Sequence, residues 1–385
     1  MLTVKGRIPG GPFTEVQFAG KKIGVVLTPA KSQRLTSSEN KDLFIAPGFI
    51  DIQVNGFAGI DFNHPNFCGE NLVTVCKRIL RTGITRFCPT LVTGSSGRLS
   101  RSIQETLKAY KKHSLVRSMV LGIHLEGPYI NSDDGPRGAH PKAHISDPDW
   151  EEFYRLYKLS NGLLRLVTVA PELTGGLEFI KKASQTGLIV GLGHCAPDPE
   201  IIDAAADAGA ILSIHLGNGA HHMLPRHTNY IQKQIAHNGL MASIICDGNH
   251  LPDYFVKNLV RAKGKSKIIL ITDATAATEA PPGRYTLGEL VIEASEDGIL
   301  RLPGTPYLAG STLTMDKAVI NCARFARVTL GSAINMATMN PAKLFDGISG
   351  RLEAGQRADL VLFRVKRDGI HIVQVYLAGR LLYSA

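Results

Sequence analysis

Eight short apolar runs, each ending in polar or turn-forming residues, constrain the fold of this chain more than any other feature. They occupy residues 49–54, 85–91, 119–125, 164–170, 188–192, 210–216, 241–246 and 267–271. Continuous apolar runs are typical of strands buried on both faces, as in a parallel sheet. Most runs are followed by helical spacing, such as Leu99, Ile103 and Leu107. Eight strand–helix units in about 300 residues predict a closed (β/α)8 TIM barrel, and the lack of a GxGxxG motif disfavours a doubly wound sheet.

The two ends of the chain have a different pattern. Short β-type runs at residues 15–18 and 22–27 open the sequence, and runs at 358–365 and 371–383 close it. Such runs at both termini predict pairing between the first and last segments. We therefore expect residues 1–46 and 350–385 to form one small β-sandwich domain, with residues 47–349 forming the barrel. Two domains suit a length of 385 residues.

The chain is basic, with 43 Lys and Arg against 33 Asp and Glu. Residues 77–117 hold ten basic side chains and one acid, Glu105. Such a field can attract nucleic acid or another anion, or it can be the solvated face of two surface helices. Aromatic residues do not alternate with the basic ones, as a stacking platform for bases requires. We therefore favour surface helices and expect no nucleic-acid partner.

The six cysteines form no CxxC pair. Residues 1–10 hold no apolar signal segment, and no stretch approaches 18 uninterrupted apolar residues. These observations predict reduced thiols in a cytoplasmic protein with no membrane partner.

Titratable side chains recur at the ends of the predicted strands, where a structural core would place Val, Ile or Leu. Glu126 follows the third run, His194 the fifth and Asp273 the eighth, while His215 lies near the end of the sixth. The carboxyl ends of barrel strands carry the chemistry in TIM-barrel enzymes. A lone histidine there is usually a hydrogen-bonded core residue, but four such positions favour a site. Two imidazoles and a carboxylate can hold Zn²⁺ with one position open to water, and Asp273 can act as the general base.

Several motifs resemble those of known enzymes. APGFID at 46–51, NPAKLF at 340–345 and the segment 350–361 resemble the amidohydrolase superfamily. A narrower match is carried by HLEGPY at 124–129, LGH at 192–194, DGNH at 247–250, TDAT at 272–275 and LAGSTL at 308–313. These motifs are similar to those of N-acetylglucosamine-6-phosphate deacetylases, and the resemblance spans nearly the whole chain.

The resemblance implies a homodimeric enzyme that removes acetate from N-acetylglucosamine 6-phosphate to give glucosamine 6-phosphate. Glu126, His194 and His215 match the metal ligands and Asp273 the general acid/base, while His140 matches a residue that holds the substrate carbonyl. The positions that match sugar and phosphate contacts are Ala139, Asn218, Gly219, Arg226, His250, Leu308, Ala309 and Gly310.

The first predicted strand bears on the number of metal ions. Many amidohydrolases carry His-x-His there and bind two ions, whereas this chain has Gln53 and Asn55. Amides are poor replacements for imidazole as Zn²⁺ ligands. We therefore expect one divalent ion, Zn²⁺ in preference to Fe²⁺, Co²⁺ or Mn²⁺.

One segment departs from the family pattern, which reads close to HL[FY]NAM after the sixth strand. Here residues 215–226 read HLGNGAHHMLPR. His221, His222 and His227 are either additional phosphate donors or, as we favour, plain loop residues. The alternative substrates are therefore the galactosamine epimer, a non-phosphorylated sugar or another N-acyl compound. A barrel without catalytic activity is disfavoured because the ligand set is complete.

Overall fold

The computed structural model of the protein describes residues 1–28 and 42–385. Its centre is a sheet of eight parallel strands in the order β5-β8-β9-β10-β11-β12-β13-β14. The strands are β5 (Phe49–Val54), β8 (Ile84–Val92), β9 (Ile123–Glu126), β10 (Leu164–Val169), β11 (Ile189–Leu192), β12 (Leu212–Ser213), β13 (Met241–Ile245) and β14 (Ile268–Ile271). Each predicted run overlaps one of these strands, so the (β/α)8 prediction is confirmed.

The first and last strands of this sheet meet and close the barrel. Beyond the end of β14, the Asp273 amide donates to the Gln53 carbonyl at 3.1 Å, and the Asn55 amide donates to the Ala274 carbonyl at 2.7 Å. Lower in the same seam, the Thr272 hydroxyl donates to the buried Asp51 carboxylate at 2.5 Å. The seam therefore brings residues 51–55 beside residues 272–274.

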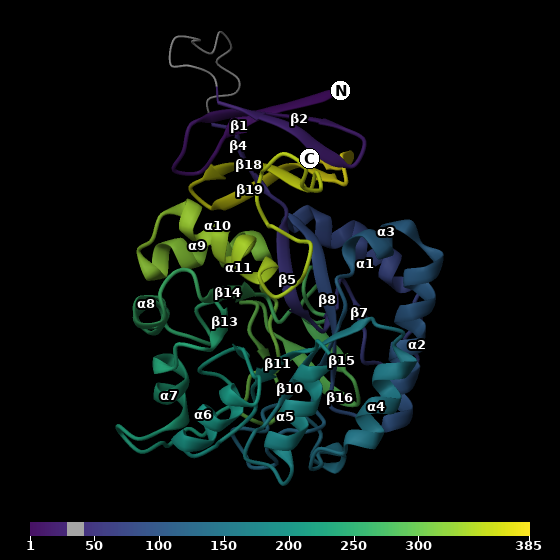
Figure 1. The fold of residues 1–385 in the computed structure, drawn as a ribbon, viewed down its shortest axis with the longest axis vertical. Coiled ribbons are helices and arrows are strands. Elements are labelled where there is room, and N and C mark those ends of the chain that lie inside the picture. The colour runs from purple at the N-terminus through teal and green to yellow at the C-terminus, as the bar shows by residue number, and fades with distance from the viewer. Residues whose placement is uncertain (29–41) are drawn as a thin grey trace.

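Helices surround the barrel (Figure 1). They are α1 (Asn71–Ile79), α2 (Ser96–Lys112), α3 (Ser114–Met119), α4 (Trp150–Leu159), α5 (Gly176–Gln185), α6 (Pro199–Asp207), α7 (Tyr230–Ala236), α8 (Asp253–Lys263), α9 (Met315–Ala326), α10 (Leu330–Met336) and α11 (Met339–Ala342). In α2 the Ser95 side chain caps the first turn by accepting from the Arg98 amide, and Leu99 and Ile103 are buried. Most of the basic side chains of residues 77–117 are exposed, as predicted, although Arg98 is buried.

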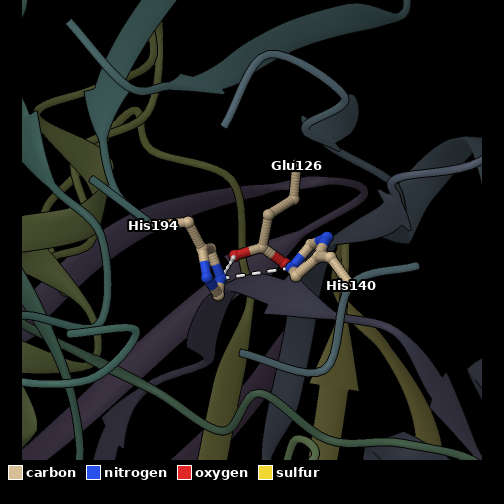
Figure 2. A group of neighbouring side chains, drawn as sticks. All are labelled: Glu126, His140 and His194. Atoms are coloured by element: carbon tan, nitrogen blue, oxygen red, sulfur yellow. Dashed lines mark hydrogen bonds and ion pairs between the residues drawn. The ribbon is translucent and has the colours of Figure 1, made fainter. Parts of the chain in front are cut away.

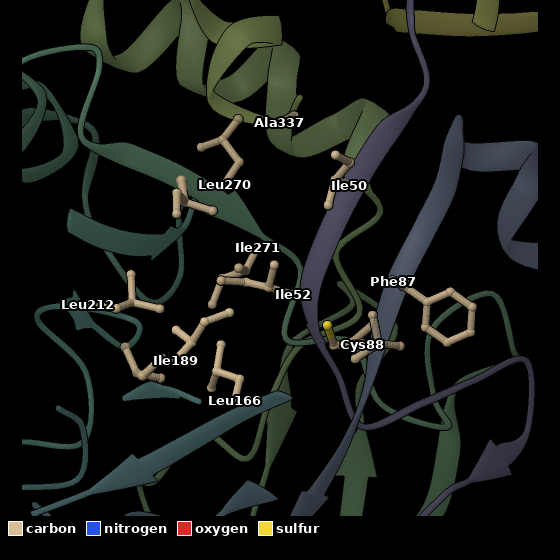
Figure 3. Packing of buried hydrophobic residues seen from close by; sticks show 14 of the residues in the cluster. Ile50, Ile52, Phe87, Cys88, Leu166, Ile189, Leu212, Leu270, Ile271 and Ala337 are labelled. Carbon is tan, nitrogen blue, oxygen red and sulfur yellow. The ribbon is translucent and has the colours of Figure 1, made fainter. Parts of the chain in front are cut away.

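Apolar side chains fill the space between the strands. Ile52, Leu166, Ile189 and Ile271 are buried and gather there (Figure 3). Burial of one such side chain contributes about 1.5–3 kcal/mol. The apolar runs that predicted the strands are therefore also the main source of the core.

The two ends of the chain share one seven-stranded sheet, drawn in purple and yellow at one end of the molecule (Figure 1). Its strands are β1 (Leu2–Arg7), β2 (Phe13–Ala19), β3 (Lys22–Leu27), β4 (Phe44–Pro47), β18 (Leu360–Lys366), β19 (Gly369–Leu377) and β20 (Arg380–Ser384). Along β18, Leu360 and Leu362 pack with Phe18 of β2, whereas Val361 and Phe363 join the barrel cluster. This alternation gives the sheet two apolar faces. The division into residues 1–46 with 350–385 and 47–349 stays a prediction.

The sequence patterns miss or misplace some elements. The small sheets β15 (Gly283–Leu287), β16 (Leu290–Ala294) and β17 (Leu300–Arg301), and β6 (Gly56–Phe57) with β7 (Ile60–Asp61), were not expected. The sixth strand is only two residues long, and just beyond it the His215 amide donates to the Ser243 hydroxyl at 2.8 Å and not to a strand carbonyl.

All six cysteines are free. Among the described residues, no helix has both the length and the apolar character that a membrane crossing requires.

Candidate active site

A cavity of about 440 Å³ lies at the carboxyl ends of the barrel strands. The structure brings most of the predicted site residues to its wall. These are Glu126, Ala139, His140, His194, His215, Asn218, Gly219, His250, Asp273, Leu308 and Gly310. The strand-end rule thus led to Glu126, His194, His215 and Asp273, which share one space although they are separated by up to 147 positions in the sequence, and the family resemblance led to the others.

Two predicted residues are not part of the described lining. Arg226 is exposed on the loop that follows β12. Ala309 is buried and packs in a small apolar cluster with Val92 and Leu287, which themselves line the cavity. Ala309 therefore supports the wall from behind, and Arg226 lies outside the cavity of its own chain.

The deepest part of the site is a buried group of one carboxylate and three imidazoles. His215 Nε2 lies 3.0 Å from Glu126 Oε1 and 3.1 Å from His194 Nε2. His194 Nε2 also lies 3.5 Å from Glu126 Oε1 and 3.2 Å from His140 Nε2. Figure 2 shows Glu126 between His140 and His194. Although burial opposes ionisation, the close contacts with His194 and His215 hold the pKa of Glu126 well below its ordinary value.

The orientation of His194 suits a metal ligand. Its Nδ1 donates to the Pro136 carbonyl at 2.8 Å, and a carbonyl can only accept, so Nε2 carries the lone pair in the neutral ring. Gly138 and Gly219 leave room for the ring, because a Cβ at Gly219 would lie 2.8 Å from His194 Nδ1. One ligand atom from each of Glu126, His140 and His194 falls within 4.8 Å of the others. With His215 Nε2 beside them, Glu126 and His194 give a mixed N/O donor set that fits a divalent transition metal.

Three of the predicted site residues have strained backbones. His194, His215 and Asp273 have φ angles of 50°, 29° and 53°, in or near the left-handed region that side chains other than Gly rarely adopt. Each follows the end of a barrel strand, at β11, β12 and β14. Such strain is commonly found at functional sites, where the surrounding structure holds the side chain in place.

His140 is buried and is held from both sides. Its Nδ1 lies 2.8 Å from the Thr93 hydroxyl, and its Nε2 faces His194. Burial, followed by the neighbouring His194, lowers the pKa of His140 well below its ordinary value. A neutral ring whose Nδ1 accepts from Thr93 carries its proton on Nε2, on the side of the metal ligands.

Asp273 is oriented by the two amides of the first strand and its end. Asn55 Nδ2 donates to Asp273 Oδ1 at 2.7 Å, and Gln53 Nε2 donates to the same oxygen at 3.0 Å and to Glu126 Oε1 at 2.8 Å. Burial, and then the negative charge of Glu126, raise the pKa of Asp273 to about 7. A carboxylate with a pKa near neutrality can both take up and release a proton at physiological pH.

The rest of the wall offers polar contacts nearer the solvent. His250 Nδ1 donates to Asp247 Oδ2 at 2.7 Å, which directs its Nε2 away from Asp247. Asn218 donates to the His215 carbonyl from its side-chain Nδ2 at 3.1 Å and from its backbone amide at 2.9 Å, which ties the β12 loop to the backbone of His215.

Two strand ends that sequence reasoning passed over also carry polar side chains that hold residues around the site. Thr93 follows β8 and contacts His140. Glu172 follows β10, and its carboxylate accepts from Asn131 at 2.9 Å and from the Ala196 amide at 2.6 Å. The rule that found Glu126 and His194 would have found both. Tyr307, which also lines the cavity, lies far from any barrel strand and has no such signal.

A closed parallel barrel with a buried carboxylate–imidazole cluster at its strand ends defines a metal-dependent hydrolase. The amidohydrolase family model matches residues 44–382. N-acetylglucosamine-6-phosphate deacetylase from Bos taurus is 33% identical over 379 residues, covering 94% of this chain and 90% of the relative. The chain therefore belongs to the amidohydrolase family, within its N-acetylglucosamine-6-phosphate deacetylase branch.

Two further relatives bear on the details. An N-acetyl-D-glucosamine-6-phosphate deacetylase from Mycobacterium smegmatis, a variant with one aspartate replaced by alanine, was solved in complex with N-acetyl-D-glucosamine-6-phosphate. It matches with a TM-score of 0.88 and 27% identity over 99% of this chain and 98% of that one. An N-acetylgalactosamine-6-phosphate deacetylase from Escherichia coli O157:H7 is 32% identical over 340 residues, covering 88% of this chain and 87% of the relative.

Proposed function

We propose that the protein hydrolyses the acetamide of N-acetylglucosamine 6-phosphate, releasing acetate and leaving glucosamine 6-phosphate. The observation that carries the proposal is the convergence of Asp273 with the Glu126–His194–His215 cluster in one buried site. The family relatives support the choice of reaction and substrate.

Glu126, His194 and His215 are the residues that would hold one divalent metal ion. When bound, the ion would supply a Lewis acid for the acetamide carbonyl and lower the pKa of water. Gln53 and Asn55 support a single ion, because both direct their NH₂ groups at carboxylates and so act as donors rather than ligands. Zn²⁺ is the ion we propose, with Fe²⁺, Co²⁺ and Mn²⁺ as the alternatives for the same donor set.

The chain's own groups can carry out the proton transfers. Asp273 accepts the proton of the attacking water, and then, protonated, gives it to the departing amine. The Asn55 and Gln53 amides occupy Oδ1, which leaves Oδ2 to exchange the proton. His140 donates from Nε2 to the carbonyl oxygen as it becomes negative, provided that Thr93 donates to Nδ1.

One relative is named as an N-acetylgalactosamine-6-phosphate deacetylase, so the assay must also compare the two sugar epimers. Purified protein with a measured metal content would be assayed for acetate release from N-acetylglucosamine 6-phosphate, N-acetylgalactosamine 6-phosphate and N-acetylglucosamine. We expect the highest kcat/KM on the first. A higher value on the second would reassign the substrate and retain the chemistry.

The Asp273→Asn variant tests the mechanism. It should retain the metal ion and lose about 10²–10⁴-fold in kcat, because Asn cannot accept the proton. Near-normal turnover with full metal content would contradict the role of Asp273. Chelation of the metal should abolish turnover, and added Zn²⁺ should restore it.

The expectations of a homodimer and a cytoplasmic location stay predictions. Arg226 bears on the expectation of a homodimer. Its exposed side chain can contact phosphate only after a movement of its loop or in the cavity of a second copy. Sedimentation of the purified protein would give its oligomeric state.

A further inference from the structure

The cavity has a buried end and an open mouth. Glu126, His194 and Asp273 are buried at the inner end, whereas His222 and Pro306 are exposed and Tyr307 is half-buried at the mouth. The acetamide on C2 and the phosphate on C6 leave opposite sides of a pyranose ring. A substrate with its amide at the inner end must therefore direct its phosphate to the mouth.

The mouth must provide hydrogen-bond donors for a dianion. Among the residues described, neither Lys nor Arg contributes to the cavity wall. Arg226, expected from the family pattern to bind phosphate, is exposed outside it. Within one copy of the chain, the described lining side chains that can carry a positive charge are therefore histidines.

The three histidines of the β12 loop have different surroundings. His221 is tethered, because its amide donates to the Tyr230 hydroxyl at 2.9 Å and its Nδ1 lies 3.1 Å from the same oxygen. His227 is exposed and lies outside the described lining. His222 lines the cavity, and its ring nitrogens have no hydrogen-bond partner in the described part of the chain. Of the three, His222 is therefore the one that lines the cavity and whose ring nitrogens are free of hydrogen bonds within the described residues.

The His222 ring is held in place by Tyr307. Their rings stack with centroids 5.7 Å apart and planes inclined by 19°. Tyr307 immediately precedes the Leu308–Gly310 segment, and His222 follows Asn218 and Gly219, so the stack joins the two loops that carry predicted sugar contacts. Stacking uses the faces of the imidazole and leaves the nitrogens at its edge for a ligand.

We infer that His222, oriented by Tyr307, binds the phosphate group of the substrate at the mouth of the cavity. The inference rests on the proposed function. His222 lies in the segment 215–226, where this chain differs from the HL[FY]NAM pattern of the family. The same ring would recognise any sugar phosphate whose amide occupies the inner end.

The test compares His222→Phe, which retains an aromatic ring for stacking and removes both nitrogens, with His227→Phe as the matched control. The first readout is kcat/KM on N-acetylglucosamine 6-phosphate and on N-acetylglucosamine. The second is calorimetric binding of glucosamine 6-phosphate, which needs no turnover. Metal content and melting temperature establish that each variant is folded and loaded.

We expect His222→Phe to weaken glucosamine 6-phosphate binding at least about tenfold, the loss of a charge-assisted hydrogen bond. Its kcat/KM should fall at least about tenfold more on the phosphorylated substrate than on N-acetylglucosamine. His227→Phe should change neither quantity. Tyr307→Ala should weaken phosphate binding in the same direction, because the ring loses its support.

An equal loss on both substrates would overturn the inference and reduce His222 to a structural residue. So would unchanged binding of glucosamine 6-phosphate in His222→Phe, and a loss in Arg226→Ala would then assign the phosphate contact to Arg226. If the wild type binds glucosamine 6-phosphate through His222 but releases no acetate, the proposed function fails and the phosphate contact stands.

Discussion

Asn55 and Asp273 meet across the closing seam of the barrel, where Asn55 Nδ2 donates to Asp273 Oδ1 at 2.7 Å. The direction of this bond is fixed by chemistry, because an ionised carboxylate can only accept. Gln53 donates to the same oxygen. The amide oxygens Gln53 Oε1 and Asn55 Oδ1 are buried and, within the described residues, have no hydrogen-bond partner. The two amides therefore serve Asp273 at the cost of leaving their own oxygens unpaired.

Removing the Asn55 amide should lower turnover without emptying the metal site. Asn55→Leu keeps the size of the side chain and removes the donor that holds Asp273. We expect kcat to fall about 10–100-fold, as for other residues that orient catalytic groups. Metal content should be unchanged, because Asn55 touches none of the proposed ligands in the described hydrogen bonds. The exposed Asn238→Leu is the control, and a loss of metal in Asn55→Leu would point to a ligand role instead.

The same variant should move the acid side of the pH profile. Burial raises the pKa of Asp273 to about 7, and the hydrogen bond from Asn55 opposes that rise. A bound divalent ion also lowers this pKa. Asp273 must be ionised to accept a proton, so kcat/KM falls as the pH drops below its pKa. In Asn55→Leu the pKa rises, and the acid limb of kcat/KM should move to higher pH. An unmoved limb, with metal content constant across the range, would argue that another group sets it.

The glycine at position 219 should be required for His194 to bind metal. A Cβ there would lie 2.8 Å from His194 Nδ1, and the residue has φ +55°. Gly219→Ala should therefore displace the imidazole and weaken metal affinity about 10–100-fold. Gly187→Ala is a matched control with φ +83° and nothing within 4 Å of the added Cβ, so it suffers only the backbone strain of about 1–2 kcal/mol. Equal metal affinities in the two variants would show that the contact with His194 has no effect.

The barrel and the inner end of the site could be predicted because both follow from strands. Glu126, His194 and Asp273 lie at or just after strand ends, and parallel strands bring such ends together whatever their separation in sequence. The same logic reaches Thr93 and Glu172 once every strand end is considered.

The mouth of the cavity could not be predicted in this way. Tyr307 follows β17 in a region where no element was expected, and its stacking on His222 joins two loops whose paths are set by tertiary contacts. The sixth strand was predicted too long for a related reason. Its apolar run continues through Ile214, but the backbone turns at His215, where φ is 29°. The pattern of apolar residues indicates which positions are buried, but it does not indicate where the backbone turns.

The buried Asp51 carboxyl should make stability depend on pH. Burial raises its pKa from 3.8 to about 7, against the hydrogen bonds from Thr272 and Gln53. The folded state then binds a proton more strongly than the unfolded chain. Its contribution to stability is therefore greatest at low pH and falls by up to about 1.4 kcal/mol per pH unit between 3.8 and about 7.

Urea unfolding of metal-free protein at pH 5 and pH 8 would measure this effect against Asp51→Asn, which cannot titrate. The stability of the wild type relative to Asp51→Asn should be lower at pH 8 than at pH 5. Thr272→Val removes the hydroxyl that donates to Asp51 at 2.5 Å. It should cost about 1–3 kcal/mol, with the larger loss at pH 8, where the ionised carboxylate loses its donor. If the difference in unfolding free energy between the wild type and Asp51→Asn is the same at the two pH values, the pKa of Asp51 does not differ between the folded and the unfolded chain in this range.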